Sequence, residues 1–247
     1  MNWDLVALFI IVALGSSIQR ISGMGLGIVG GPFMSLAFGP VKGIFVTNVL
    51  AMVNASFTTA SVHKRVTWRY FWQIAPATLL GIIPGAFVVR IFPASWLMII
   101  AGSLLLIALS VVTLGNRYVP RVTGTASAVG AGMIAGFMNA LAGIAGPAIT
   151  VYAHAARWEQ TALAATLQPI FIVTGFGSFS VKAMLGAMSF SAIDPWIWPV
   201  GVVALFLGLR IGGLIAPRVS RGTAHTMALG LAGLGGLITV VRGVVVL

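Results

Sequence analysis

The stretch Ser22-Gly23-Met24-Gly25-Leu26-Gly27-Ile28-Val29-Gly30-Gly31-Pro32 interrupts a long apolar part of the chain. Its five glycines and one proline weaken a helix, because glycine raises the entropic cost of ordering the backbone and proline lacks an N–H donor. A second such stretch, GFMNALAGIAGP, runs from Gly136 to Pro147. In hydrocarbon a broken backbone is tolerated only inside protein or beside a water-filled cavity. Paired interruptions in two halves of a chain therefore indicate a transporter's binding site.

The composition identifies an integral membrane protein. Of 247 residues, 59% are hydrophobic and only 7% are charged, whereas a soluble domain carries about 25% charged residues. At about 20 residues per membrane helix, the length allows eight to ten segments and leaves no room for a soluble domain. The absence of cysteine excludes disulfides and thiolate metal sites. The first apolar run has no basic region before it and is interpreted as a retained membrane segment.

The apolar runs predict an all-α polytopic membrane protein with short or broken glycine-rich helices. The run at 24–38 barely reaches across a hydrocarbon core of about 30 Å. The predicted segments are 3–20, 24–38, 41–62, 70–91, 95–115, 122–142, 143–156, 160–185, 193–215 and 223–242.

The second half of the chain is expected to repeat the plan of the first. The polar interval Asn116–Arg121 divides the chain into a first repeat, residues 1–116, and a second repeat, residues 117–247. Small residues four apart let two membrane helices approach closely, and such pairs recur in the fourth run of each half. The matched features are Gly31-Pro32 with Gly146-Pro147, and Leu80-Gly81 plus Gly85 with Leu207-Gly208 plus Gly212.

The basic residues predict the orientation. With ten segments and the N-terminus outside, nine basic residues fall on the cytoplasmic side and four outside. This agrees with the excess of Lys and Arg that cytoplasmic loops carry. Five segments per half make the two repeats inverted. The less favoured alternative treats each break as a kink, which gives eight segments and parallel repeats. The nine are Arg20, Lys64, Arg65, Arg69, Arg117, Arg121, Arg157, Arg218 and Arg221, and the four are Lys42, Arg90, Lys182 and Arg242.

The residues do not indicate an enzyme, a metal site or a cofactor. The three acids of the chain, Asp4, Glu159 and Asp194, all lie at predicted segment ends. No histidine has a metal-ligand partner at helical spacing. The basic residues that give the net charge of +11 lie between apolar runs and do not cluster into a face that could bind nucleic acid.

An anion could be held here by uncharged donors. Backbone N–H groups at a helix start lack internal partners and carry partial positive charge, so two breaks aimed at one point would provide two such ends. Amides and hydroxyls buried in the apolar runs would add side-chain donors, with Asn139 foremost because it lies in the second break. The predicted substrate-binding residues are Gly25, Gly27, Gly30, Gly31, Thr47, Asn48, Asn139, Gly143, Gly146, Thr166 and Gln168.

At these residues the chain resembles the sulfite exporter TauE/SafE family of bacterial membrane permeases. The likeness covers nearly the whole chain, although alanines stand at 140, 142 and 145 where the family often has glycine. It is carried by Gly25, Gly27, Gly30, Gly31 and Pro32, by Val66-Thr67-Trp68-Arg69, by Pro76, Gly81 and Gly85, and by Ala135-Gly136-Phe137 through Gly143-Ile144-Ala145-Gly146-Pro147.

The resemblance implies a permease of the inner, or plasma, membrane for a small anion such as sulfite or an organosulfonate like sulfoacetate. The expected mechanism is alternating access at a site in mid-membrane. An anion channel and a non-transporting membrane assembly factor stay open as alternatives. The expected partners are the anion and the lipid bilayer, and the sequence leaves a homo-oligomer open.

Overall fold

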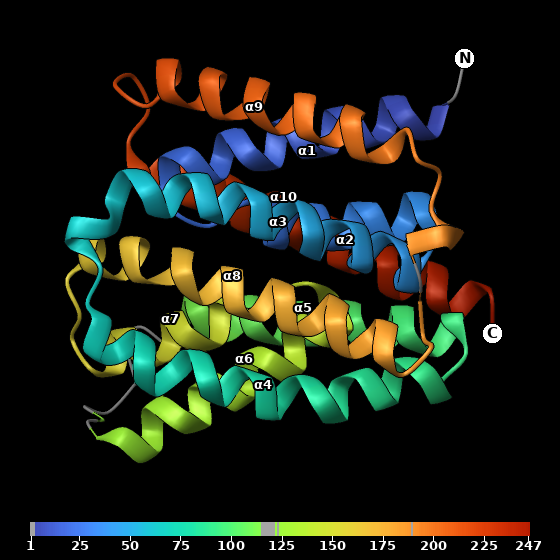
Figure 1. Ribbon diagram of the computed structural model, residues 1–247, viewed down its shortest axis with the longest axis horizontal. Helices are drawn as coiled ribbons and strands as arrows, with labels where there is room; N and C mark the ends of the chain where they lie inside the picture. Colours follow the sequence, from blue (N-terminus) through green and yellow to red (C-terminus); the bar gives the residue numbers. More distant parts are fainter. Residues whose placement is uncertain (1–2, 115–121, 123, 189) are drawn as a thin grey trace.

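The computed structural model describes residues 3–114, 122, 124–188 and 190–247. The described part is all-helical, and its long helices run roughly parallel to one axis (Figure 1). The predicted dividing interval, Asn116–Arg121, lies outside the described residues. The helices are α1 (Trp3–Ser22), α2 (Leu26–Phe38), α3 (Pro40–Val62), η1 (His63–Arg65), α4 (Trp68–Ile91), α5 (Ala94–Leu114), α6 (Thr125–Ala142), α7 (Gly146–Ala155), α8 (Gln160–Met184), η3 (Phe190–Ala192), α9 (Ile197–Ile215) and α10 (Arg221–Val245).

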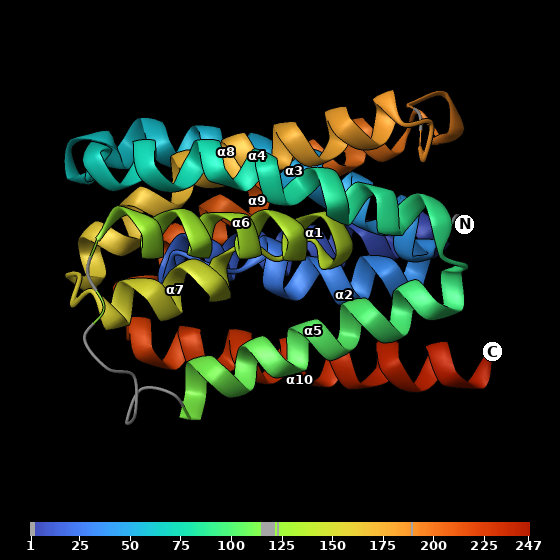
Figure 2. The same ribbon diagram turned by 90° about the horizontal axis from the view of Figure 1, so that it is seen from below.

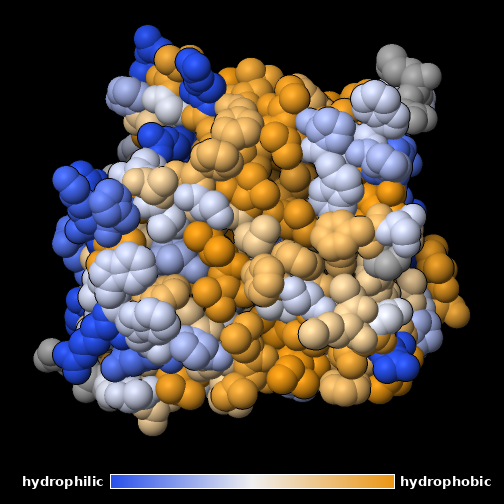
Figure 3. Space-filling model, in the orientation of Figure 1, coloured by the Kyte–Doolittle hydropathy of each residue, from blue (hydrophilic) through white to orange (hydrophobic). Residues whose placement is uncertain are grey.

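Eight of the described helices are long and apolar enough to cross a membrane, judged by length and composition. The protein is thus a multi-pass membrane protein. The other two α-helices are short: α2 has 13 residues and α7 has 10, so at 1.5 Å per residue neither spans about 30 Å of hydrocarbon. Figure 3 shows a hydrophobic band on one face of the molecule, with hydrophilic residues gathered along the margin that contains η1.

The chain reverses direction at the first break, between α1 and α2. Gly23 ends α1 in the left-handed region (φ 85°), which glycine adopts without a steric penalty, and its N–H donates to the Gln19 carbonyl at 2.9 Å. A Cβ on Gly25 would overlap the Gly15 carbonyl and the Gln19 nitrogen, so the chain past the break lies directly against α1. The alternative of one kinked helix through this region is therefore wrong.

The second break has the same local geometry. Gly143 ends α6 in the left-handed region (φ 71°), and its N–H donates to the Asn139 carbonyl at 2.9 Å. Pro147 then stands in the first turn of α7, where a missing N–H costs nothing. By contrast, Pro32 lies inside α2. The two Gly-Pro pairs thus occupy different positions relative to their breaks, and matching them from sequence was wrong.

The glycine pairs of the two fourth helices serve close packing. A Cβ on Gly81 would overlap the Met133 carbonyl of α6, and a Cβ on Gly208 would overlap the Ala13 carbonyl of α1. The hydroxyl of Ser17 also donates to the Gly208 carbonyl at 2.9 Å. Helix α4 therefore packs on α6, and α9 packs on α1 (Figure 1), and the close approach predicted for such glycine pairs is confirmed.

The remaining helices complete two sides of the bundle. Helices α5 and α10 lie side by side on one face, where a Cβ on Gly102 would come within 2.7 Å of the Gly236 carbonyl (Figure 2). Helices α3 and α8 pack against each other on the opposite face. The two breaks lie between these layers, where Met24, Gly25 and residues 143–145 are buried.

Candidate functional site

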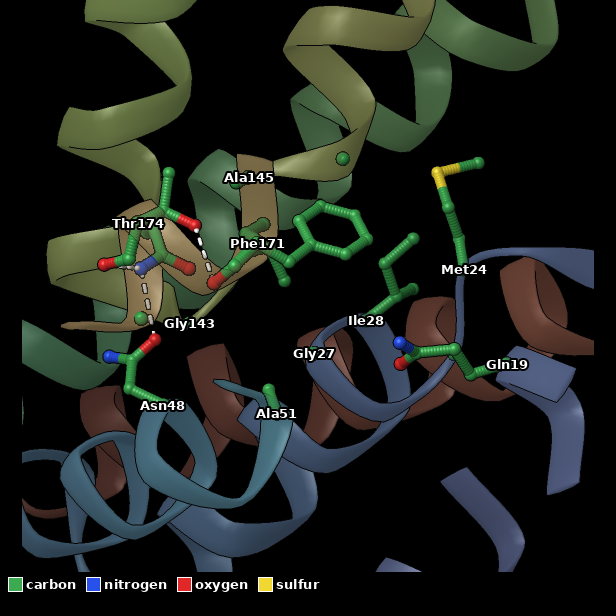
Figure 4. Close-up of a pocket in the computed structure, with 15 residues that line it drawn as sticks. Gln19, Met24, Gly27, Ile28, Asn48, Ala51, Gly143, Ala145, Phe171 and Thr174 are labelled. Carbon is green, nitrogen blue, oxygen red and sulfur yellow. Dashed lines mark hydrogen bonds between the residues drawn. The ribbon is translucent and has the colours of Figure 1, made fainter. Parts of the chain in front are cut away.

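The two breaks meet at a small internal cavity. Its wall includes Met24, Gly25 and Gly27 from the first break and Gly143 and Gly146 from the second (Figure 4). The breaks also touch directly, because a Cβ on Gly27 would come within 2.7 Å of the Gly143 carbonyl oxygen. The cavity volume is about 30 Å³, which holds roughly one water molecule and is too small for sulfite. The site is therefore closed in this structure.

An asparagine pair joins the second break to α3 and α8. The side-chain amide of Asn139 donates to Asn48 Oδ1 at 2.9 Å and to the Thr174 carbonyl at 3.1 Å (Figure 4). Asn48 in turn donates to Ser178 Oγ at 3.0 Å. All four residues are buried. Because each amide lies in a low-dielectric interior, the network fixes the last turn of α6 against both neighbouring helices.

A glutamine pair holds the first break in an equivalent way. Gln19 Oε1 accepts from the Leu26 backbone N–H at 3.1 Å, so this side chain caps the start of α2. Gln19 Nε2 donates to Gln168 Oε1 at 3.1 Å, and Gln168 Nε2 donates to the Gly23 carbonyl at 2.9 Å. Gln19 is 2% exposed and lines the cavity. The free carbonyl left by the break is thereby satisfied inside the protein.

The electrostatics of the cavity come from dipoles alone. The described residues of its wall include no acid, lysine, arginine or histidine. The starts of α2 and α7 both face it, and the first N–H groups of a helix have no partner within that helix. Such ends carry about half a positive charge, which suits a small anion and disfavours a cation.

Six of the eleven predicted residues line the cavity: Gly25, Gly27, Asn48, Asn139, Gly143 and Gly146. The other five do not, and each has another role in the described structure. Two are glycines that face neighbouring helices, and three are side chains that form hydrogen bonds elsewhere. Gly30 faces Thr47 and Gly31 faces the Ala142 carbonyl, Thr47 donates to Gly43, Thr166 accepts from the Thr67 N–H, and Gln168 bonds Gln19 and Gly23.

Sequence reasoning missed Gln19, Met24, Phe171 and Thr174, which all line the cavity. Gln19 lies at the end of the predicted segment 3–20, beside Arg20, a position where a polar residue draws no notice. A usable signal was present: Gln19 precedes Gly23 by four residues, and Asn139 precedes Gly143 by the same interval. Both place an amide one turn before the glycine that ends the helix.

A larger cavity of about 510 Å³ lies on the other side of Met24. Met24 lines both spaces, and its sulfur lies 3.4 Å from the Thr150 hydroxyl. The larger wall also contains His154, Gln160 and His225. Met24 thus lines both the small central cavity and a space large enough for a small organic anion.

The described residues contain no group of three or more His, Cys, Asp or Glu side chains that could hold a metal ion. Two helix breaks whose residues line one small cavity inside a bundle of membrane-spanning helices are typical of a polytopic transport protein.

The chain belongs to the TauE/SafE sulfite exporter family, whose profile matches residues 8–240. This family consists of membrane transporters and not of enzymes. Searches of curated proteins and of solved structures each returned no match to the chain.

Proposed function

We propose that the protein is a carrier for a small anion, either sulfite or an organosulfonate such as sulfoacetate. One observation carries the proposal: residues at two helix starts, from breaks about 120 residues apart, line one small cavity whose described wall has polar side chains but no charged one. Donors of this kind neutralise part of an anion's charge without a fixed ion pair that would retain it. Backbone N–H groups at Gly25, Gly27 and 144–146 bind the substrate beside Asn139 and Asn48, since the N–H groups of Leu26 and Gly143 already donate within the protein.

We further propose that the two halves, residues 1–116 and 117–247, are inverted repeats that rock against each other. The exchange of partners supports this: the fourth helix of each half packs on the first helix of the other, through a glycine pair. The matched amides, Gln19 and Asn139, support the same correspondence. Carriers of this design alternate access around a fixed site near the membrane midplane.

The orientation proposed is an N-terminus outside the cell membrane. The turn between α3 and α4 holds Lys64 and Arg65, and the turn after α7 holds Arg157. Both turns lie at the end of the bundle opposite the N-terminus (Figure 1). Because basic residues favour cytoplasmic loops, this end faces the cytoplasm.

The test is flux in proteoliposomes. Purified protein should carry radiolabelled sulfite with a saturable rate, and unlabelled sulfite loaded inside should accelerate uptake by counterflow. Saturation without counterflow would indicate a channel. A protein that carries neither sulfite nor sulfoacetate above empty liposomes would favour the assembly-factor alternative and end the proposal.

A further inference from the structure

Lys182 is a fully buried cation near the end of α8. Its side chain is 0% exposed, and its ammonium nitrogen has no hydrogen-bond partner in the part of the chain that the structure describes. The sequence analysis places Lys182 at the outer end of the predicted segment 160–185, and in the structure α8 extends to Met184 with Lys182 buried on its packed face. A buried ammonium without a partner costs several kcal/mol.

Lys182 continues a buried polar line that begins at the cavity. Thr174 lines the cavity, and Ser178 and Lys182 follow at intervals of four residues, which puts all three on one face of α8. Their exposed fractions are 1%, 0% and 0%. At 1.5 Å per residue, Lys182 lies about 12 Å from Thr174 along the helix.

The first two members of this line are already joined to the central site. The Thr174 carbonyl accepts from Asn139, and Ser178 Oγ accepts from Asn48. Side chains on a helix lean toward its N-terminus, and for Lys182 this is the direction of Ser178 and the cavity. The ammonium is thus the one member of the line left without a partner among the described residues.

We propose that Lys182 is a second, transient binding site for the transported anion, between the central cavity and the end of the bundle at which α8 ends. This inference rests on the proposed anion transport. An anion leaving the cavity along α8 meets an ammonium that no protein group neutralises. The lysine therefore attracts the anion along this side of the path, and the anion offsets the cost of the buried charge.

The test compares two lysine variants in the sulfite flux assay. In Lys182→Met, the half-saturating sulfite concentration should rise at least ~10-fold, as expected for losing a charged hydrogen bond. Its thermal unfolding temperature should stay the same or rise, because an unpaired buried charge is removed. The control is Lys42→Met, which removes a lysine from the same end of the bundle and should leave flux unchanged.

The outcomes separate the two proposals. If the parent protein shows no saturable flux, the proposed function and this inference both fail. If the parent transports sulfite and Lys182→Met has the same half-saturating concentration, only the inference fails.

A cysteine variant keeps the test valid even if Lys182→Met does not fold. The chain has no cysteine, so Lys182→Cys can be labelled selectively. A small anionic thiol reagent should modify Lys182→Cys but not Val46→Cys, which is equally buried among apolar side chains of α1, α3 and α9. Equal resistance of both cysteines would overturn the proposal.

Discussion

Substituting Gly27 by alanine should push the two breaks apart. A Cβ at this position would lie 2.7 Å from the Gly143 carbonyl oxygen, about 0.7 Å inside an ordinary contact of 3.4 Å. The matched control is Gly30→Ala in the same helix, whose Cβ would meet Thr47 Cγ2 at an ordinary 3.5 Å. Both substitutions gain the same helix propensity, about 1 kcal/mol, so that term cancels between them.

The difference in unfolding free energy between the two variants therefore measures the steric strain that a Cβ at position 27 causes against Gly143. Overpacking of a well-packed interior costs about 1–3 kcal/mol, so Gly27→Ala should unfold with a free energy lower than that of Gly30→Ala by this amount. Unfolding by SDS titration from mixed micelles measures the difference. Gly27 also lines the central cavity and Gly30 does not, so sulfite flux should fall in Gly27→Ala alone. Equal stability and equal flux in the two variants would refute the contact between the breaks and the role of the cavity.

Three further predictions follow from single side chains or glycines. Asn139→Ala should lower unfolding stability by about 1–3 kcal/mol, since two buried acceptors lose their donor, and should abolish stabilisation of the protein by sulfite in a thermal-shift assay. Gly81→Ala should lower the unfolding temperature because its Cβ overlaps the Met133 carbonyl, whereas Gly213→Ala, with nothing within 4 Å, should not. Met24→Ala should join the central and larger cavities and raise sulfite leak without saturation, and an unchanged, saturable flux would argue against a barrier at this residue.

The positions of the breaks could be predicted from the sequence because glycine acts locally. Gly23 and Gly143 end their helices through their own backbone freedom, and no distant contact is needed for that. The direction of the chain after each break could not be read in the same way. It depends on packing, such as the close approach of Gly25 to α1, and this packing is what excludes a kinked helix.

The candidate site was predicted only in part, for a related reason. Gly30 and Gly31 lie in the same glycine-rich stretch as Gly27, but the helical rotation of α2 turns them toward Thr47 and the Ala142 carbonyl. Gln19 was missed because its function arises only when the chain folds back and brings the Leu26 N–H within 3.1 Å. The sequence shows that a polar side chain lies in an apolar segment, but the fold determines which group it forms a hydrogen bond with.

If the protein is the anion carrier proposed above, the distribution of charge around the cavity accounts for both binding and release of the anion. The central cavity uses partial charges at two helix starts, since a full cation at mid-membrane without a partner would be costly to bury. The one described ammonium that is both buried and unpartnered stands about 12 Å away along α8, past the asparagine network. On the other side of the cavity, Met24 separates it from a larger space lined by His154 and His225. In the proposed carrier, weak binding at the centre with positive or polarisable groups on both sides would let the anion leave in either direction when one half of the bundle moves relative to the other.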